Sequence, residues 1–108
     1  MKTFILGRTK EEVERLVPEN QIKTVRLGEE KICLSRKGES YFAFERACPH
    51  RKADLGQGFI NKFEEIICPL HEYRFNLQTG ICSHSNCPDL KIYKTEITGD
   101  GLKITLDT

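Results

Sequence analysis

The chain has 108 residues, with 17 basic and 16 acidic side chains, so it has room for one domain and carries almost no net charge. This length excludes a large multidomain enzyme, and the even mixture of charges argues against a nucleic-acid-binding surface. No apolar run approaches the roughly 18 residues of a membrane span, and no segment is typical of an export signal. We therefore expect a cytoplasmic protein that binds neither nucleic acid nor membrane.

The first part of the chain is expected to form short strands around one short helix. A strand is predicted at 2–6, and Thr9 is a suitable N-cap for a helix at 10–17 that Pro18 ends. Three runs rich in β-branched and aromatic residues follow, separated by glycine-containing turns, and they predict an antiparallel meander. These runs are 21–27, 31–35 and 41–45.

The last part of the chain predicts a β-hairpin. Two apolar-rich runs, at 92–97 and 102–106, flank the turn sequence Gly99-Asp100-Gly101. In the second run apolar residues alternate with polar ones, which is the pattern of a strand with one buried face. The residues expected on that face are Leu102, Ile104 and Leu106.

The middle of the chain, from 46 to about 89, differs in composition from the rest. It contains four of the five cysteines, all three histidines and three of the four prolines. Two short strands are expected inside it, at 64–67 and 73–76, followed by a turn at 78–80. We therefore predict a single all-β domain, 1–108, in which a loop-built subdomain at about 46–89 is set into an antiparallel sandwich or barrel with one short helix.

Two compact groups of residues in this middle part indicate metal chemistry. Cys48-Pro49-His50 is followed, after 17 intervening residues, by Cys68-Pro69-Leu70-His71. A thiol and an imidazole on each of two tight turns would form a preorganised site with two sulfur and two nitrogen ligands. A structural zinc ion accepts this ligand set, although Cys-x-His is a short spacing for zinc.

The same spacing resembles that of the Rieske-type [2Fe-2S] ferredoxin family, and further segments such as Ala53-Asp54-Leu55-Gly56 and Thr79-Gly80 are similar to the family's pattern. The resemblance implies a Rieske-type β-sandwich that carries one [2Fe-2S] cluster. It also implies that Cys48 and Cys68 bind the inner iron, and that His50 and His71 bind the outer, more exposed iron.

The chain departs from the high-potential, respiratory type of this family. Those relatives carry a disulfide between cysteines at the positions of Ala53 and Leu70, so the disulfide cannot form here. They also place hydroxyl groups near the cluster, at the positions of Tyr73 and Phe75, and Phe75 has none. We therefore predict a reduction potential at the low end of the family's range, about −150 mV.

The resemblance implies a soluble one-electron carrier that is not itself an enzyme. Such a carrier would pass electrons from a flavin reductase to a terminal oxygenase or a similar redox enzyme, and we expect it to be a monomer in isolation. Two alternatives remain open at this point: a small subunit of an NADH-dependent nitrite reductase, and a non-redox module stabilised by zinc.

The remaining cysteines and a group of basic residues allow two interpretations each. Cys82 and Cys87, which flank His84, could be a redox-active pair or alternative cluster ligands, but we favour two unlinked loop thiols because no Cys-x-x-Cys pattern joins them. Cys33 is expected to be a small buried residue of a strand. Five basic residues near the metal loops could steer an acidic partner or could simply be solvated: Arg46, Arg51, Lys52, Lys62 and Arg74.

Overall fold

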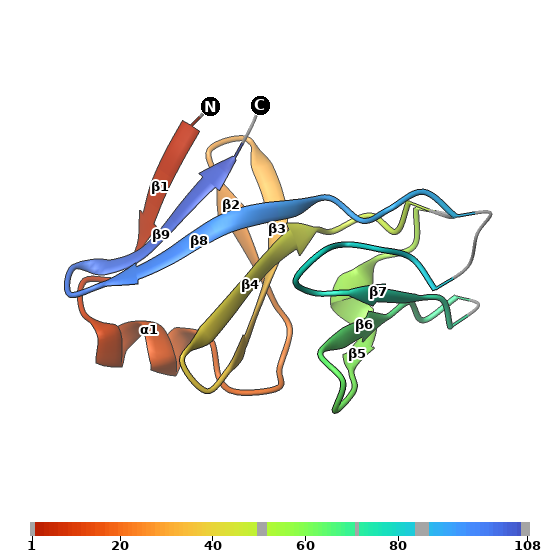
Figure 1. Cartoon of the computed structure of the whole chain (residues 1–108). Helices are drawn as coiled ribbons and strands as arrows, with labels where there is room; N and C mark the ends of the chain where they lie inside the picture. The colour runs from red at the N-terminus through yellow and green to blue at the C-terminus, as the bar shows by residue number, and fades with distance from the viewer. Residues whose placement is uncertain (1, 50–51, 71, 84–86, 107–108) are drawn as a thin grey trace.

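The computed structural model describes residues 2–49, 52–70, 72–83 and 87–106, and the structure is a six-stranded and a three-stranded antiparallel sheet with one short helix (Figure 1). The elements are β1 (Lys2–Leu6), α1 (Lys10–Leu16), β2 (Lys23–Leu27), β3 (Glu30–Lys37), β4 (Ser40–Glu45), the 3-10 turn η1 (Leu55–Gln57), β5 (Phe59–Ile60), β6 (Glu65–Ile67), β7 (Arg74–Asn76), β8 (Ile92–Thr98) and β9 (Gly101–Leu106).

The large sheet has the strand order β1-β9-β8-β4-β3-β2, and the small sheet has the order β5-β6-β7. The predicted antiparallel all-β architecture is therefore confirmed, and so is the hairpin of β8 and β9 at the end of the chain. The sequence did not predict β5 or η1, which are two and three residues long. Elements this short carry too few residues to show a periodic pattern.

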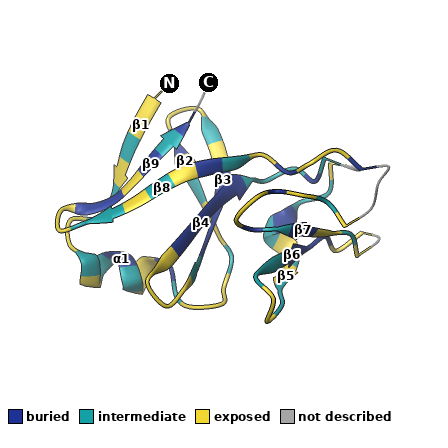
Figure 2. Cartoon of the chain, in the orientation of Figure 1, coloured by how far each residue is buried: buried dark blue, intermediate teal, exposed yellow. Residues whose placement is uncertain are grey.

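Strands β3 and β4 are buried on both faces, so they are shared by two separate cores (Figure 2). Because successive side chains of a strand point to opposite faces, Leu34 and Ala43 enter the first core, while Cys33 and Phe44 enter the second. The predicted burial of Cys33 is thus confirmed, and burial raises the pKa of its thiol to about 11.

The first core lies between the large sheet and α1. It contains Val13 of the helix and the alternating residues of β9, which are buried as predicted: Leu102, Ile104 and Leu106. The helix begins at the predicted N-cap, where the Thr9 hydroxyl accepts a hydrogen bond of 3.1 Å from the Glu12 N–H. It ends one residue earlier than expected, at Leu16.

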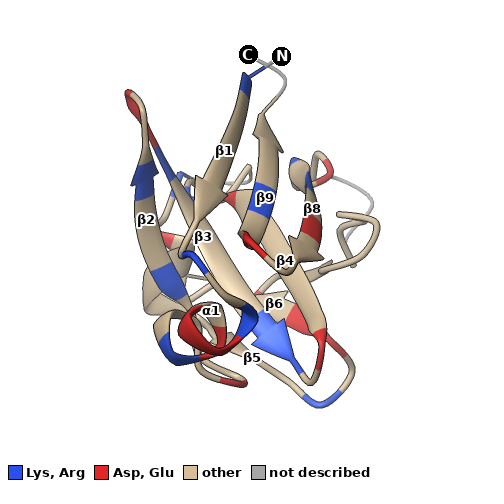
Figure 3. Cartoon of the chain, turned by 90° about the vertical axis from the view of Figure 1, so that its left-hand side faces the viewer, with Lys and Arg blue, Asp and Glu red and all other residues tan. Residues whose placement is uncertain are grey.

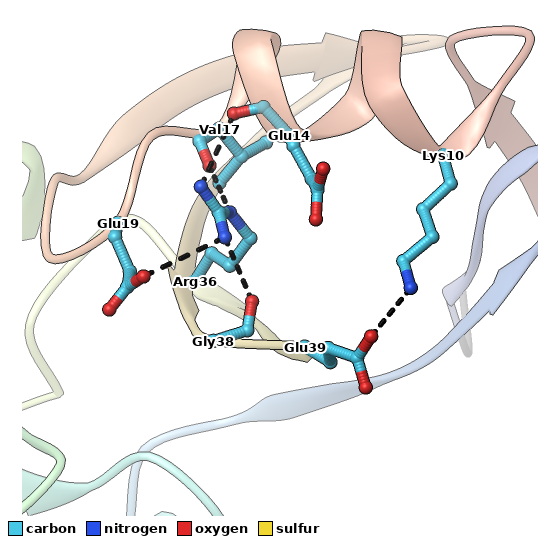
Figure 4. A network of polar contacts seen from close by, with 7 residues as sticks. All are labelled: Lys10, Glu14, Val17, Glu19, Arg36, Gly38 and Glu39. Carbon is cyan, nitrogen blue, oxygen red and sulfur yellow. Dashed lines mark hydrogen bonds and ion pairs between the residues drawn. The ribbon is translucent and has the colours of Figure 1, made fainter.

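An arginine of β3 connects the end of the helix to the turn between β3 and β4 (Figure 4). Arg36 Nε donates to the Val17 carbonyl at 2.8 Å, and Arg36 Nη1 donates to the Gly38 carbonyl at the same distance. The guanidinium therefore satisfies a carbonyl that the helix itself leaves without an internal donor.

The second core lies between the small sheet and strands β3 and β4. The segments that flank this core extend to the end of the molecule opposite α1 (Figure 1). The segment that follows β4 and the segment that precedes β8 both run to this end. Around the opposite end, which carries α1, acidic and basic residues are interspersed (Figure 3). Among the described residues, no helix has the length and apolar character needed to cross a bilayer.

Candidate metal centre

The first cysteine loop is closed by two backbone hydrogen bonds. The Cys48 N–H donates to the Ala53 carbonyl at 2.8 Å, and the Lys52 N–H donates to the Cys48 carbonyl at 2.7 Å. Lys52 adopts a positive φ of 62°, a left-handed conformation that turns the chain back toward Ala53. The loop therefore holds Cys48 on a tight turn, as the sequence predicts.

The second cysteine loop repeats this closure at equivalent positions. The Cys68 N–H donates to the Tyr73 carbonyl at 2.9 Å, and the Glu72 N–H donates to the Cys68 carbonyl at 3.1 Å. Glu72 has a φ of 57° and occupies the place that Lys52 holds in the first loop. The two loops thus share one backbone design, although their sequences differ.

The two loops place both predicted cysteine ligands inside the second core. Cys48 and Cys68 are both buried in the same cluster of core residues. Burial raises the pKa of the Cys68 thiol, and Cys48 raises it further. In the opposite direction, the backbone N–H of Leu70 lowers this pKa.

A pair of adjacent buried thiols on matching loops fits a metal centre with soft ligands. Two buried thiolates in one core would repel each other, and a metal cation bound to both neutralises their charge. The predicted histidine ligands, His50 and His71, lie outside the described residues. Within the described ranges, no group of three or more metal-ligating side chains occurs, so this part of the chain supplies two thiols.

A third segment, whose described parts are 80–83 and 87–90, packs against the same core and carries the other two cysteines. Cys87 is buried in the second core together with Cys48 and Cys68, and the half-buried Cys82 packs against this core. Burial raises the pKa of the Cys87 thiol to about 12, with smaller contributions from Cys82 and from the two loop cysteines. The sequence left open whether Cys82 and Cys87 are a redox-active pair, alternative cluster ligands or two unlinked loop thiols, and their spacing alone gives no sign that Cys87 shares a core with Cys48 and Cys68.

The third segment approaches its neighbour closely at one glycine. Gly80 has a φ of 81°, and its N–H donates to the Asn76 carbonyl while the Leu90 N–H donates to the Gly80 carbonyl, both at 2.7 Å. A Cβ at this position would lie 2.1 Å from the Leu90 carbonyl oxygen. Because glycine has no Cβ, the backbone at Gly80 can pack directly against the backbone of Leu90.

The basic residues near the loops do not form a uniform ring. Arg46 is paired with Asp54, to which its Nε and Nη2 donate at 3.2 and 3.1 Å. Arg51 lies outside the described residues, whereas Lys52, Lys62 and Arg74 are exposed. A hollow of about 460 Å³ beside the first loop is lined by Lys31, Arg46, Ala47, Lys52 and Asp54.

Comparisons with known proteins identify the family of the chain. Residues 9–94 match the family model of the Rieske [2Fe-2S] domain. The chain is 31% identical over 83 residues to the ferredoxin component of the naphthalene 1,2-dioxygenase/salicylate 5-hydroxylase systems of Ralstonia sp., an alignment that covers 75% of this chain and 78% of that protein.

Two solved structures show the same fold. The ferredoxin of carbazole 1,9a-dioxygenase from Nocardioides aromaticivorans IC177 has a TM-score of 0.82 at 20% identity, over 97% of this chain and 98% of that one. A putative NADH-dependent nitrite reductase small subunit from Mycobacterium tuberculosis has a TM-score of 0.78 at 15% identity, over 95% and 93% of the two chains.

Proposed function

The chain belongs to the Rieske [2Fe-2S] domain family, and we propose that Cys48 and Cys68 bind one iron of its cluster while His50 and His71 bind the other. The observation that carries this assignment is the burial of both thiols in one core, on loops with matching backbone hydrogen bonds. The histidine assignment rests on the spacing of each histidine from its cysteine.

The protein is a one-electron carrier of the ferredoxin type, a component of a redox system. When bound, the cluster accepts and releases one electron, and its imidazole ligands raise the reduction potential above that of an all-thiolate centre. The chain contributes the rest: the two loops hold the thiols in a buried position, and the Leu70 N–H stabilises the negative charge on the Cys68 sulfur.

The metal-bearing end of the molecule suits a transient docking partner. Leu70 and Ile81, which immediately precede His71 and Cys82, expose 45% and 59% of their surface. The hollow beside the first loop adds exposed cations, Lys31 and Lys52. We place a terminal oxygenase and a flavin reductase at this end, each with acidic groups facing the hollow, and we place the carrier in the cytoplasm as a monomer.

A second candidate function is that of a nitrite reductase small subunit, favoured by the fold shared with the Mycobacterium tuberculosis protein. The two functions differ in the redox partner and not in the cluster. Reduced protein mixed with an oxygenase or with a nitrite reductase large subunit distinguishes them, because the cognate partner reoxidises the carrier rapidly and with saturation.

The cluster and its ligands are tested by metal analysis and electron paramagnetic resonance. We expect two iron and two sulfide per chain, and a Rieske-type spectrum after reduction with dithionite. His71→Ala and Cys68→Ser should each lose this spectrum, because each removes one ligand.

Matched controls come from the third segment, where His84→Ala and Cys82→Ser should keep the full spectrum. An unchanged spectrum in His71→Ala contradicts the ligand assignment. A colourless protein with one zinc per chain and no sulfide contradicts the carrier function and supports the zinc module.

A further inference from the structure

The third segment forms a loop whose two ends meet beside the metal loops. The Cys82 N–H donates to the Asp89 carboxylate at 3.2 Å, and Cys82 pairs across a β-bridge with Phe75 of β7. These contacts hold Cys82 beside Asp89, two residues after Cys87, and beside β7. Cys82 packs against the core cluster that contains the buried Cys87, five residues along the chain, and the Cys82 thiol contributes to the raised pKa of Cys87.

We propose that Cys82 and Cys87 are a redox-active dithiol that converts reversibly to an intrachain disulfide. The half-buried Cys82 is the side chain that an oxidant reaches first, and the buried Cys87 is placed to displace the product of that attack. No disulfide links any of the five cysteines in this structure.

The reaction uses a low-molecular-weight disulfide, such as oxidised glutathione, as the oxidant. The Cys82 sulfur attacks one glutathione sulfur, the glutathione disulfide bond breaks, and one glutathione leaves as its thiol. The Cys87 sulfur then attacks the Cys82 sulfur of the mixed disulfide and releases the second glutathione. Two S–H bonds of the protein are replaced by one S–S bond, and two electrons and two protons pass to glutathione.

The position of the dithiol gives its oxidation a consequence for the metal centre. Cys87 packs in the same core as Cys48 and Cys68, so a disulfide there changes the side-chain surroundings of the two thiol ligands. This consequence rests on the proposed function, whereas the dithiol itself does not. A carrier of single electrons would thereby hold a second, two-electron site that responds to the thiol balance of the cell.

Trypsin separates the cysteines in a way that makes the test direct. Cys82 and Cys87 share the peptide 75–91, whereas Cys33, Cys48 and Cys68 lie on three other peptides. The holoprotein is incubated without oxygen at increasing ratios of oxidised to reduced glutathione, quenched with acid, alkylated under denaturing conditions and mapped by mass spectrometry. Iron and sulfide are measured on the same samples.

We expect the peptide 75–91 to become two hydrogens lighter and unalkylated as the glutathione ratio rises, while iron and sulfide content is unchanged. Cys33→Ala is the matched control and should behave like the wild type. In Cys87→Ser, the mixed disulfide cannot be resolved, so the same peptide should carry one glutathione on Cys82.

Three results would overturn the dithiol: double alkylation of 75–91 at every ratio, two glutathiones on that peptide, or a disulfide that links it to the peptide of Cys48 or Cys68. The failure of the proposed function is distinguished from these results by the metal assay. A protein without iron and sulfide fails as a carrier, whatever the state of 75–91.

Discussion

Asp54 connects the first cysteine loop to the turn that follows it. Its carboxylate accepts two hydrogen bonds from Arg46, and its Oδ1 also accepts from the Gly56 N–H at 2.8 Å, where η1 begins. The Arg46 guanidinium lowers the pKa of this carboxyl below its usual value, and the Gly56 N–H contributes in the same direction. Because both side chains are partly exposed, the ion pair itself adds little stability and the cap adds more.

Two replacements of Asp54 separate the stability contributed by its cap on η1 from the stability contributed by its charge. Asp54→Ala should destabilise the fold by about 1 kcal/mol through loss of the cap, and Asp54→Asn should cost less because its amide oxygen still accepts from Gly56. The folded pKa is lowered, so the stabilisation by the charge is present above the ordinary value of 3.8 and is lost as the pH falls through the folded pKa. Urea midpoints of wild type and Asp54→Asn should therefore converge on acidification, and a constant gap between them contradicts this account.

At the scale of single residues, the sequence predicted which side chains are candidate ligands better than it predicted which groups surround them. The spacing of Cys48 and Cys68 from their histidines sufficed to propose the ligands, because tight turns are local features. The effect of the Leu70 N–H on the pKa of Cys68 could not be predicted, since it depends on the backbone of the folded loop. The same holds for Cys87, which approaches Cys48 only through tertiary packing.

The short helix α1 depends on a contact from outside itself. With seven residues it is too short to be stable alone, and Arg36 of β3 supplies donors to its C-terminal end (Figure 4). A lysine at this position has one compact donor group and cannot bond Val17 and Gly38 in the same forked geometry.

Arg36→Lys should therefore reduce the free energy of unfolding by about 1–2 kcal/mol, measured by urea denaturation. Lys10→Ala is a suitable comparison, because its ion pair with Glu39 is solvent-exposed and its loss should produce no measurable change. Equal stability of the wild type and Arg36→Lys would show that the helix does not need the guanidinium.

Two glycines with similar backbone conformations allow the close approach at Gly80 to be tested. Gly38 has a φ of 61° and open space where a Cβ would lie, whereas a Cβ at Gly80 meets the Leu90 carbonyl oxygen. Gly38→Ala should cost about 1 kcal/mol of stability from backbone strain alone, and Gly80→Ala should cost at least about 2 kcal/mol more from the steric clash. Similar thermal unfolding of the two variants would contradict the proposed role of Gly80.

At the scale of elements, long strands and the terminal hairpin were predicted to within a few residues, because the alternation of apolar and polar residues and the turn residues can be read directly from the sequence. The expected helix at 10–17 and the strands at 21–27 and 31–35 differ from α1, β2 and β3 only at their ends. The pairing of β8 with β4 was not predictable, since it joins segments that are far apart in the sequence.

The whole molecule has two cores that share β3 and β4, and one of them contains the thiols that we propose as ligands. Metal binding contributes free energy to the core that holds its ligands, so the two cores should not depend on the metal equally. In hydrogen exchange, removal of the cluster should lower protection in β6 and β7 and leave the β8–β9 hairpin protected. A uniform change across both sheets would show that the cores unfold as one unit.

The two cysteine loops match in backbone but not in charge. Lys52 and Glu72 stand at equivalent positions, both exposed, and one is a cation where the other is an anion. A binding face with approximate two-fold symmetry would bind a partner equally well in two orientations related by a half-turn. The opposite charges remove that ambiguity, because reversal would set like charges against each other and weaken the encounter.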